Sequence, residues 1–286
     1  MSHVFHTYTQ AELDAQYNLR ARHPEHESFF AWYAAESARV RSQLAHRADL
    51  AYGEGPLATL DAFPAEKAGA PLHVFIHGGY WQFMDKASFS FPAQTFVGAG
   101  AAFVSVNYPL APAVGMDTIV SKCREAIAWC HRNAASLNAD PERIHISGHS
   151  AGGHLTGMLM TSGWEATHGL PAGVIRSGCA ISGLFDLEPI RLCYMNAVLS
   201  LDPESSRRNS PLYHLPPQAG PLIAAVGGEE TGEFLRQNRD FAAAWQGAGL
   251  TGEELVLPGL NHFNVVQELL YPQTALSRAM LNQMGL

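Results

Sequence analysis

The feature of this sequence that most constrains its fold is a serine between glycines at residues 148–152, Gly-His-Ser-Ala-Gly. Residues 143–147 predict a short strand before this motif, and residues 152–160 predict a helix after it. On such a strand–turn–helix, the pattern G-x-S-x-G holds the serine hydroxyl out of the sheet, where a histidine can remove its proton. The two glycines let strand and helix pack without a Cβ clash. The motif therefore predicts that Ser150 is a nucleophile.

The order of the other predicted elements indicates a mainly parallel α/β sheet, because strands alternate with helices as they do in βαβ units. Apolar or alternating runs predict strands at 57–63, 72–76, 101–106, 143–147, 174–181, 222–226 and 254–257. Helical patterns predict helices at 11–22, 25–47, 117–133, 152–160, 233–246 and 275–284. We expect a single domain over residues 1–286, with a central sheet of about eight strands flanked by helices.

Two segments depart from this alternation. Residues 1–48 predict a helical N-terminal extension that is interrupted at Pro24, because proline breaks or kinks a helix. Residues from about 186 to 220 are rich in proline and predict a small cap-like insertion beside the pocket. The sequence has no internal repeat, low-complexity tract or long linker that would divide the chain.

The composition restricts the partners. A net charge of −8 at pH 7 argues against nucleic acid and against anionic membrane surfaces. No run approaches the roughly 18 apolar residues that span a bilayer, and the first residues lack the basic and apolar segments of a secretion signal. We therefore expect a cytoplasmic protein with a small-molecule substrate. The sequence leaves the oligomeric state open, with a homodimer as one alternative.

The four cysteines leave metal or redox use as the alternative to buried free thiols. Cys123, Cys130, Cys179 and Cys193 form no C-x-x-C pair. Buried free thiols are therefore expected in preference to a metal site or a disulfide. We expect neither a metal nor a cofactor.

The predicted base is His262, on the loop between the last predicted strand and the last predicted helix. In triads of this type, nucleophile, acid and histidine follow one another in that order along the chain. Three other histidines lie near the motifs, and we expect them to organise loops or to pack. They are His77, His149 and His154.

The predicted acid lies after the next-to-last strand, where residues 227–230 read Gly-Gly-Glu-Glu with no aspartate. Hydrolases with this arrangement often carry G-x-x-D, and counting from the first glycine predicts Glu230. Its carboxylate would accept the imidazole Nδ1–H and stabilise the imidazolium as it forms. Glu229 and Asp186 remain alternatives.

The predicted oxyanion hole begins at residues 77–81, His-Gly-Gly-Tyr-Trp, directly after the predicted strand at 72–76. In esterases, a glycine loop at this place donates backbone N–H groups to the oxyanion of the tetrahedral intermediate. Gly78 and Gly79 are the predicted donors, together with the N–H of Ala151 after the nucleophile. An ordinary tight turn is the alternative for the two glycines.

With these motifs, the chain resembles the kynurenine formamidase (arylformamidase) group of α/β-hydrolases, which carries H-G-G-x-W where related esterases carry H-G-G-G. Further matching segments extend nearly from end to end, at residues 17–18, 20–22, 60–64, 107–112, 182–187, 227–230, 233–237 and 261–263. The resemblance implies an α/β-hydrolase fold and the same triad and oxyanion donors: Ser150, His262, Glu230, Gly78, Gly79 and Ala151. Glutamate stands at the acid position, where many members have aspartate.

The resemblance also implies the substrate, N-formyl-L-kynurenine, which would be hydrolysed through a formyl-enzyme to L-kynurenine and formate in tryptophan degradation. Tyr80, Trp81 and Phe185 are candidates to stack on its aryl ring, with core packing as the alternative. Two other functions remain open. One is a carboxylesterase for small acyl esters, and the other is a non-catalytic binding protein that keeps a hydrolase fold.

A substrate with a carboxylate calls for a basic partner, which the sequence does not single out. Arg20, Arg22 and Arg191 are candidates, with an ordinary surface charge as the alternative for each.

Overall fold

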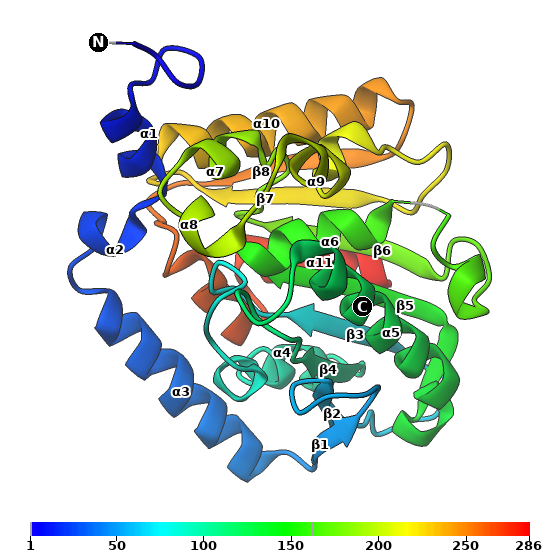
Figure 1. The fold of residues 1–286 in the computed structure, drawn as a ribbon. Coiled ribbons are helices and arrows are strands. Elements are labelled where there is room, and N and C mark those ends of the chain that lie inside the picture. Colours follow the sequence, from blue (N-terminus) through cyan, green and yellow to red (C-terminus); the bar gives the residue numbers. More distant parts are fainter. Residues whose placement is uncertain (1, 162) are drawn as a thin grey trace.

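A computed structural model describes residues 2–161 and 163–286, with one eight-stranded sheet at its centre (Figure 1). The strands are β1 (Arg47–Ala51), β2 (Thr59–Phe63), β3 (Ala70–Ile76), β4 (Ala102–Val106), β5 (Ala139–His149), β6 (Ile175–Ile181), β7 (Leu222–Gly227) and β8 (Gly252–Leu257). Their order in the sheet is β1-β2-β4-β3-β5-β6-β7-β8. β2 pairs antiparallel with β1 and β4, and all other neighbours are parallel. The predicted α/β-hydrolase architecture is thereby confirmed.

Helices cover both faces of the sheet. The α-helices are α1 (Gln10–Tyr17), α2 (Leu19–Arg22), α3 (His26–Gln43), α4 (Ala93–Gly98), α5 (Met116–Asn133), α6 (Ala151–Met160), α7 (Glu188–Leu192), α8 (Asn196–Leu199), α9 (Pro203–Arg208), α10 (Gly232–Gly247) and α11 (Ala275–Met284). The 3₁₀ helices are η1 (Lys86–Phe89), η2 (Ala134–Leu137), η3 (Ala166–His168), η4 (Pro211–Tyr213) and η5 (Val265–Leu270).

The alternation of side chains along the central strands produces two core clusters. In β3, Leu72, Val74 and Ile76 share a cluster with apolar residues of α5, α6 and α10. Phe75 points to the other face, where it shares a cluster with residues of α3, α4 and α11. A parallel strand buried on both faces is therefore apolar at nearly every position, which is the pattern that predicted it.

β1 and α4 are among the elements that the sequence analysis did not predict. β1 is mostly exposed at the edge of the sheet, so it has no apolar face to mark it. α4 has only six residues, too few for a helical period to stand out. The strand predicted at 143–147 is also longer in the structure, because Ala139 of β5 still pairs with Ala70 of β3.

The predicted N-terminal extension consists of α1, α2 and α3, with Pro24 in the turn between α2 and α3. In Figure 1, α3 runs along the outside of the sheet from the α2 end toward β1. It buries Tyr33 and Val40 in the second core cluster. The Tyr33 hydroxyl donates a hydrogen bond to the carbonyl of Phe263, so the extension contacts a loop near the other end of the chain.

The segment predicted as a cap-like insertion, residues 186–220, contains α7, α8, α9 and η4. It packs against the start of the chain, since Gln10 Nε2 donates to Leu192 O (3.0 Å). The Tyr194 N–H likewise donates to Asp14 Oδ1 (2.8 Å). The two segments outside the βαβ pattern therefore contact each other.

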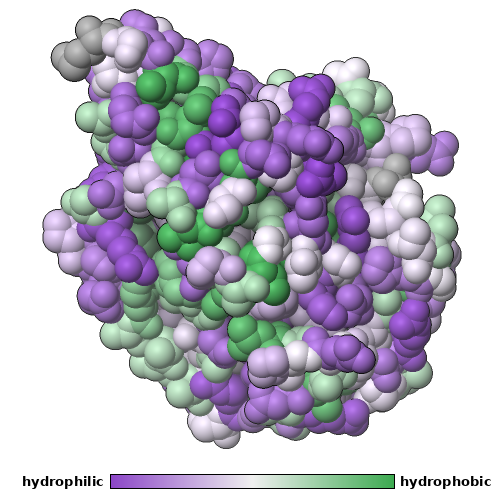
Figure 2. Space-filling view, viewed as in Figure 1, coloured by the Kyte–Doolittle hydropathy of each residue, from purple (hydrophilic) through white to green (hydrophobic). Residues whose placement is uncertain are grey.

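On the face seen in Figure 2, hydrophobic residues are interspersed with hydrophilic ones. The large apolar side chains that are most exposed come from separate parts of the chain: Tyr194, Tyr213, Val256, Tyr271 and Leu286. None of the helices in the described part of the chain has the length and hydropathy of a transmembrane span.

Buried histidines should make the stability of this fold depend on pH. His145 of β5 lies 2.8 Å from Ser177 Oγ on β6. Burial, with the charges of Arg143 and Arg176, lowers the pKa of His145 to about 4, whereas a histidine in an unfolded chain has a pKa of about 6.5. Its neutral form therefore stabilises the fold fully above pH ~6.5, and this contribution is lost as the pH falls toward 4.

From His145 alone we expect the free energy of unfolding to drop by about 2 kcal/mol between pH 7 and pH 5. Urea denaturation at the two pH values measures the total drop in the free energy of unfolding. In His145→Gln this total drop should be smaller by about 2 kcal/mol. His3→Gln is the matched control, because His3 is exposed. An unchanged pH dependence in His145→Gln would contradict the prediction.

Candidate active site

Ser150 lies on the tight turn between β5 and α6. Its φ of 58° and ψ of −117° are unfavourable for a residue with a Cβ atom, so neighbouring contacts must hold them. The Ser150 N–H donates to the carbonyl of Ile181 (2.8 Å) at the end of β6. A Cβ atom at Gly152 would lie 1.9 Å from the carbonyl oxygen of Ile76, so only glycine fits where α6 crosses β3. The strand–turn–helix geometry expected for the motif is present.

His262, on the loop between β8 and η5, forms a buried pair with Glu230. Its Nδ1–H donates to Glu230 Oε2 at 2.6 Å. The other carboxylate oxygen, Oε1, accepts from Ser182 Oγ (2.5 Å) and from the Gly227 N–H (2.9 Å). The ring of Phe234 lies 4.6 Å from the His262 ring. Since Nδ1 is occupied, Nε2 is the nitrogen that remains for a serine hydroxyl.

The two alternative acids lie elsewhere. Glu229 is exposed, and its backbone N–H donates to the carbonyl of Leu260. Asp186 lies 3.8 Å from Arg236, and burial raises the pKa of its carboxyl. Only Glu230 of the three predicted candidates therefore contacts His262. Ser182, which supports Glu230, was not predicted, although its position directly after β6 at the same sheet edge was an available signal.

The loop after β3 places Gly78 against Ser150. A Cβ atom at Gly78 would lie 3.1 Å from the Ser150 Cβ. Gly79 has a φ of 109°, and a Cβ atom there would lie 2.0 Å from Phe83 O. Within residues 2–161 and 163–286, the N–H groups of Gly78, Gly79 and Ala151 donate to no backbone acceptor outside their own element. These N–H groups therefore have no competing backbone acceptor among those contacts.

His77 is buried and holds this loop, as expected. Its Nδ1–H donates to the carbonyl of Gly78 (2.7 Å), and its Nε2 lies 3.0 Å from Asn107 Oδ1. The ring stacks on Tyr108 at a centroid distance of 4.4 Å. The Tyr108 hydroxyl in turn donates to the His77 carbonyl (2.9 Å). These contacts fix the backbone orientation of the loop just before Gly79.

His154 connects the same loop to α6 and to the cap-like segment. Trp81 Nε1–H donates to His154 Nδ1 (3.1 Å), and His154 Nε2–H donates to the Asn209 carbonyl (2.7 Å). Burial lowers the pKa of His154 to about 4, which keeps the ring neutral with one donor and one acceptor nitrogen. His149 has a similar role, since its Nε2–H donates to the His262 carbonyl (2.8 Å). Both histidines therefore bridge segments of the chain.

One pocket is lined by both Ser150 and His262. Its lining is mainly aromatic and apolar: Leu19, Arg20, Phe30, Tyr33, Gly78, Gly79, Tyr80, Phe83, Met84, Phe89, His149, Ser150, His262 and Phe263. Ser150 and His262 are each only 3% exposed, whereas Arg20 is exposed. The pocket therefore leads from the surface to the serine.

Of the three aromatic residues predicted to contact a substrate, only Tyr80 lines this pocket. Trp81 and Phe185 are fully buried. Phe185 stacks on Phe241 of α10 with ring centroids 4.1 Å apart, and the Trp81 indole is bonded to His154. For both residues the structure shows core packing, which was the alternative.

The aromatic wall comes instead from residues that were not predicted. The Phe30 ring of α3 lies 5.7 Å from that of Phe263 and 6.3 Å from that of Phe83. Phe263 directly follows the predicted base, and Phe83 follows the glycine loop, so both carried a positional signal. Phe30 carried none, because it reaches the pocket only through the packing of α3.

The three candidate arginines differ in whether they line the pocket and in whether they are paired with a carboxylate. Arg20 lines the pocket, whereas Arg22 is exposed and does not. Arg191 is already paired with Glu188, with contacts of 2.6 and 2.8 Å between guanidinium and carboxylate.

Among the residues that the structure describes, no three His, Cys, Asp or Glu side chains are grouped to hold a metal ion. All four cysteines are buried free thiols. Burial raises the pKa of Cys130 to about 12, so this thiol stays protonated at neutral pH.

Comparison with known proteins places these residues in a family. The BD-FAE family model matches residues 60–173, which include the glycine loop and Ser150. The kynurenine formamidase of Salmo salar is 31% identical over 82% of this chain and 80% of that protein. The kynurenine formamidase of Danio rerio is 30% identical over 86% of this chain and 85% of that protein. Esterase LipQ of Mycobacterium tuberculosis is 25% identical over 78% of this chain and 58% of that protein.

Solved structures agree on the fold. A candidate thioesterase from Silicibacter sp. TM1040 has a TM-score of 0.82 and 30% identity, covering 94% of this chain and 99% of that one. An esterase from Pyrobaculum calidifontis has a TM-score of 0.70 at 18% identity, covering 91% and 93% of the two chains, which supports the fold alone. The two kynurenine formamidases match more than four fifths of this chain at 30% identity or more. The chain is therefore a serine-type hydrolase, and it belongs to the kynurenine formamidase family of α/β-hydrolases.

Proposed function

We propose that this protein hydrolyses an aryl formamide, N-formyl-L-kynurenine, to L-kynurenine and formate, with Ser150, His262 and Glu230 as its triad. The observation that carries the proposal is the similarity to two kynurenine formamidases over 80% and 85% of their lengths. The His262–Glu230 bond and the pocket shared by His262 and Ser150 support the assignment of roles.

In the first half of the reaction, His262 Nε2 takes the Ser150 hydroxyl proton as Oγ bonds to the formyl carbon. The formyl oxygen becomes an oxyanion, which accepts hydrogen bonds from the N–H groups of Gly78, Gly79 and Ala151. A donor of this kind is typically worth about 10²- to 10³-fold in rate. His262 then gives its proton to the amine nitrogen, the C–N bond breaks, and kynurenine leaves a formyl ester on Ser150.

In the second half, a water molecule gives a proton to His262 and attacks the formyl carbon of the ester. The bond between that carbon and Ser150 Oγ breaks, Oγ regains its proton, and formate is released. Glu230 stays ionised throughout and stabilises the imidazolium that forms twice in each cycle.

The shape of the pocket favours a small acyl group on an aromatic leaving group. Gly78 lies against Ser150, which leaves little room on the acyl side, and a formyl group carries only a hydrogen beyond its carbonyl. The leaving group would lie along the aromatic wall made by Phe30, Phe83 and Phe263.

The proposal is tested by comparing kcat/KM for N-formyl-L-kynurenine with kcat/KM for p-nitrophenyl acetate. We expect the formamide to be preferred by about tenfold or more, which corresponds to about 1.4 kcal/mol of transition-state binding. Because the activated ester is the more reactive compound, such a preference has to come from the site.

The second candidate is a carboxylesterase for small acyl esters, which the similarity to esterase LipQ favours. If the ester is preferred by orders of magnitude and the formamide is barely turned over, the formamidase proposal is overturned and the esterase remains.

A further inference from the structure

A single positive charge lies at the mouth of the pocket. Arg20 is the one Lys or Arg among the described lining residues, and no Asp or Glu lines the pocket with it. Some arginines of the chain have carboxylate partners, with Arg191 at 2.6 Å from Glu188 and Arg236 at 2.8 Å from Glu233. No carboxylate in the described ranges forms an ion pair with Arg20, so its charge is available to a ligand.

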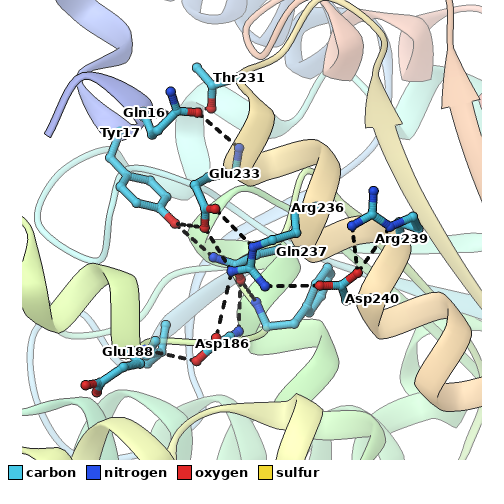
Figure 3. A network of polar contacts seen from close by, with 12 residues as sticks. Gln16, Tyr17, Asp186, Glu188, Thr231, Glu233, Arg236, Gln237, Arg239 and Asp240 are labelled. Atoms are coloured by element: carbon cyan, nitrogen blue, oxygen red, sulfur yellow. Dashed lines mark hydrogen bonds and ion pairs between the residues drawn. The ribbon is translucent and has the colours of Figure 1, made fainter. Parts of the chain in front are cut away.

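The helix that carries Arg20 is anchored by a buried polar network, drawn in Figure 3. Tyr17, at the end of α1, is fully buried. Its hydroxyl donates to Glu233 Oε2 (3.0 Å) and accepts from Gln237 Nε2 (3.0 Å), both on α10. Arg236 neutralises Glu233 at 2.8 Å. A satisfied network of this kind holds the chain just before α2 in one position.

Two further contacts extend this anchor to the pocket. The backbone carbonyl of Tyr17 accepts a hydrogen bond from the hydroxyl of Tyr80, a pocket residue (2.8 Å). The side chain of Asn18 accepts from the Ala21 N–H (3.3 Å) and so caps α2. The backbone of Arg20 is therefore fixed relative to the glycine loop, although its side chain is exposed.

The side chain of Arg20 also has a support. Its guanidinium carbon lies 4.3 Å from the ring centroid of Phe83, in cation–π geometry. Phe83 itself belongs to the aromatic wall, so the charge is held where the wall meets solvent. A guanidinium that stacks on a ring by its face keeps its edge N–H groups for a planar acceptor.

We propose that Arg20 binds the carboxylate of the substrate, so that the site selects formamides of aromatic amines with an acidic group far from the formyl end. This inference rests on the proposed formamidase function. Ser150 lies buried at the inner end of the pocket and Arg20 lies at its mouth, matching a molecule with a formamide at one end and a carboxylate at the other. Bidentate pairing of guanidinium and carboxylate supplies the recognition.

The first test compares N-formyl-L-kynurenine with formanilide, which is neutral and has no carboxylate. In Arg20→Gln, we expect the ratio of kcat/KM for the two compounds to fall by about 10-fold or more, through a higher KM for N-formyl-L-kynurenine. Arg20→Lys should restore part of the ratio. Arg22→Gln, on the same helix but outside the pocket, should leave it unchanged. An unchanged ratio in Arg20→Gln overturns the inference.

The second test needs no turnover. Titration calorimetry of L-kynurenine should show a Kd about 10-fold higher in Arg20→Gln than in the original protein, and an unchanged Kd in Arg22→Gln. If the original protein binds L-kynurenine through Arg20 but hydrolyses no formamide, the formamidase proposal fails and the carboxylate site stands. If it hydrolyses N-formyl-L-kynurenine while Arg20→Gln changes neither KM nor Kd, the function stands and the carboxylate site is overturned.

Discussion

Ser150→Ala is expected to lower kcat by about 10⁴- to 10⁶-fold on every substrate that the protein turns over. The variant keeps the oxyanion donors and His262 but has no hydroxyl to form the acyl-enzyme. Steady-state kinetics with N-formyl-L-kynurenine and with p-nitrophenyl acetate measure the loss. A fluorophosphonate probe should label the original protein and leave the variant unlabelled.

The fold should survive this substitution, because alanine keeps the Cβ atom and both backbone hydrogen bonds of Ser150. Thermal unfolding of the two proteins checks this point. Ser200→Ala is a matched control, since Ser200 also has a positive φ (51°) but is exposed directly after α8, outside the pocket. Retained activity in Ser150→Ala, or labelling of another residue, would show that the nucleophile was assigned wrongly.

Glu230→Gln is expected to lower kcat by about 10³- to 10⁴-fold, through the tautomer of His262. Ser182 Oγ and the Gly227 N–H both donate to Glu230 Oε1, so they will hold the amide oxygen of the glutamine in that place. The NH₂ group then faces His262 Nδ1 and favours the ring with its proton on Nε2. That tautomer cannot accept the proton of Ser150.

The control for Glu230→Gln is the same substitution one residue earlier. Glu229→Gln changes an exposed carboxylate that does not contact His262, so its kcat should stay near that of the original protein. Near-normal kinetics in Glu230→Gln, with a large loss in Glu229→Gln or Asp186→Asn, would assign the acid to another carboxylate. Circular dichroism and thermal unfolding establish that each variant is folded.

The parts of this protein that the sequence predicted are those with local signals. β3 is buried on both faces, so nearly every residue in it is apolar. The turn at Ser150 needs glycine at 152 for steric reasons, so this part of the fold can be recognised from the sequence motif. The order of elements then pointed to Glu230 and His262, because each follows a late strand at the same sheet edge.

The pocket wall could not be predicted in the same way. Phe30 reaches the pocket because α3 packs along the outer face of the sheet, and no pattern near Phe30 encodes that contact. Trp81 and Phe185 lie next to motif residues, yet they are buried by His154 and Phe241 from other elements. Whether an aromatic side chain meets substrate or core is decided by packing between distant segments.

The anchoring of α2 through Tyr17 divides two tasks along the chain. The residues assigned to bond breaking lie between 78 and 262, on loops at the ends of the central strands. The N-terminal helices hold no reacting group, but they contribute four residues to the lining of the pocket: Leu19, Arg20, Phe30 and Tyr33. Substitutions before residue 34 can therefore change which molecules enter without altering the chemistry that follows. Proteins that share the turn at Ser150 can therefore differ in substrate specificity through their first helices while the reaction itself stays the same.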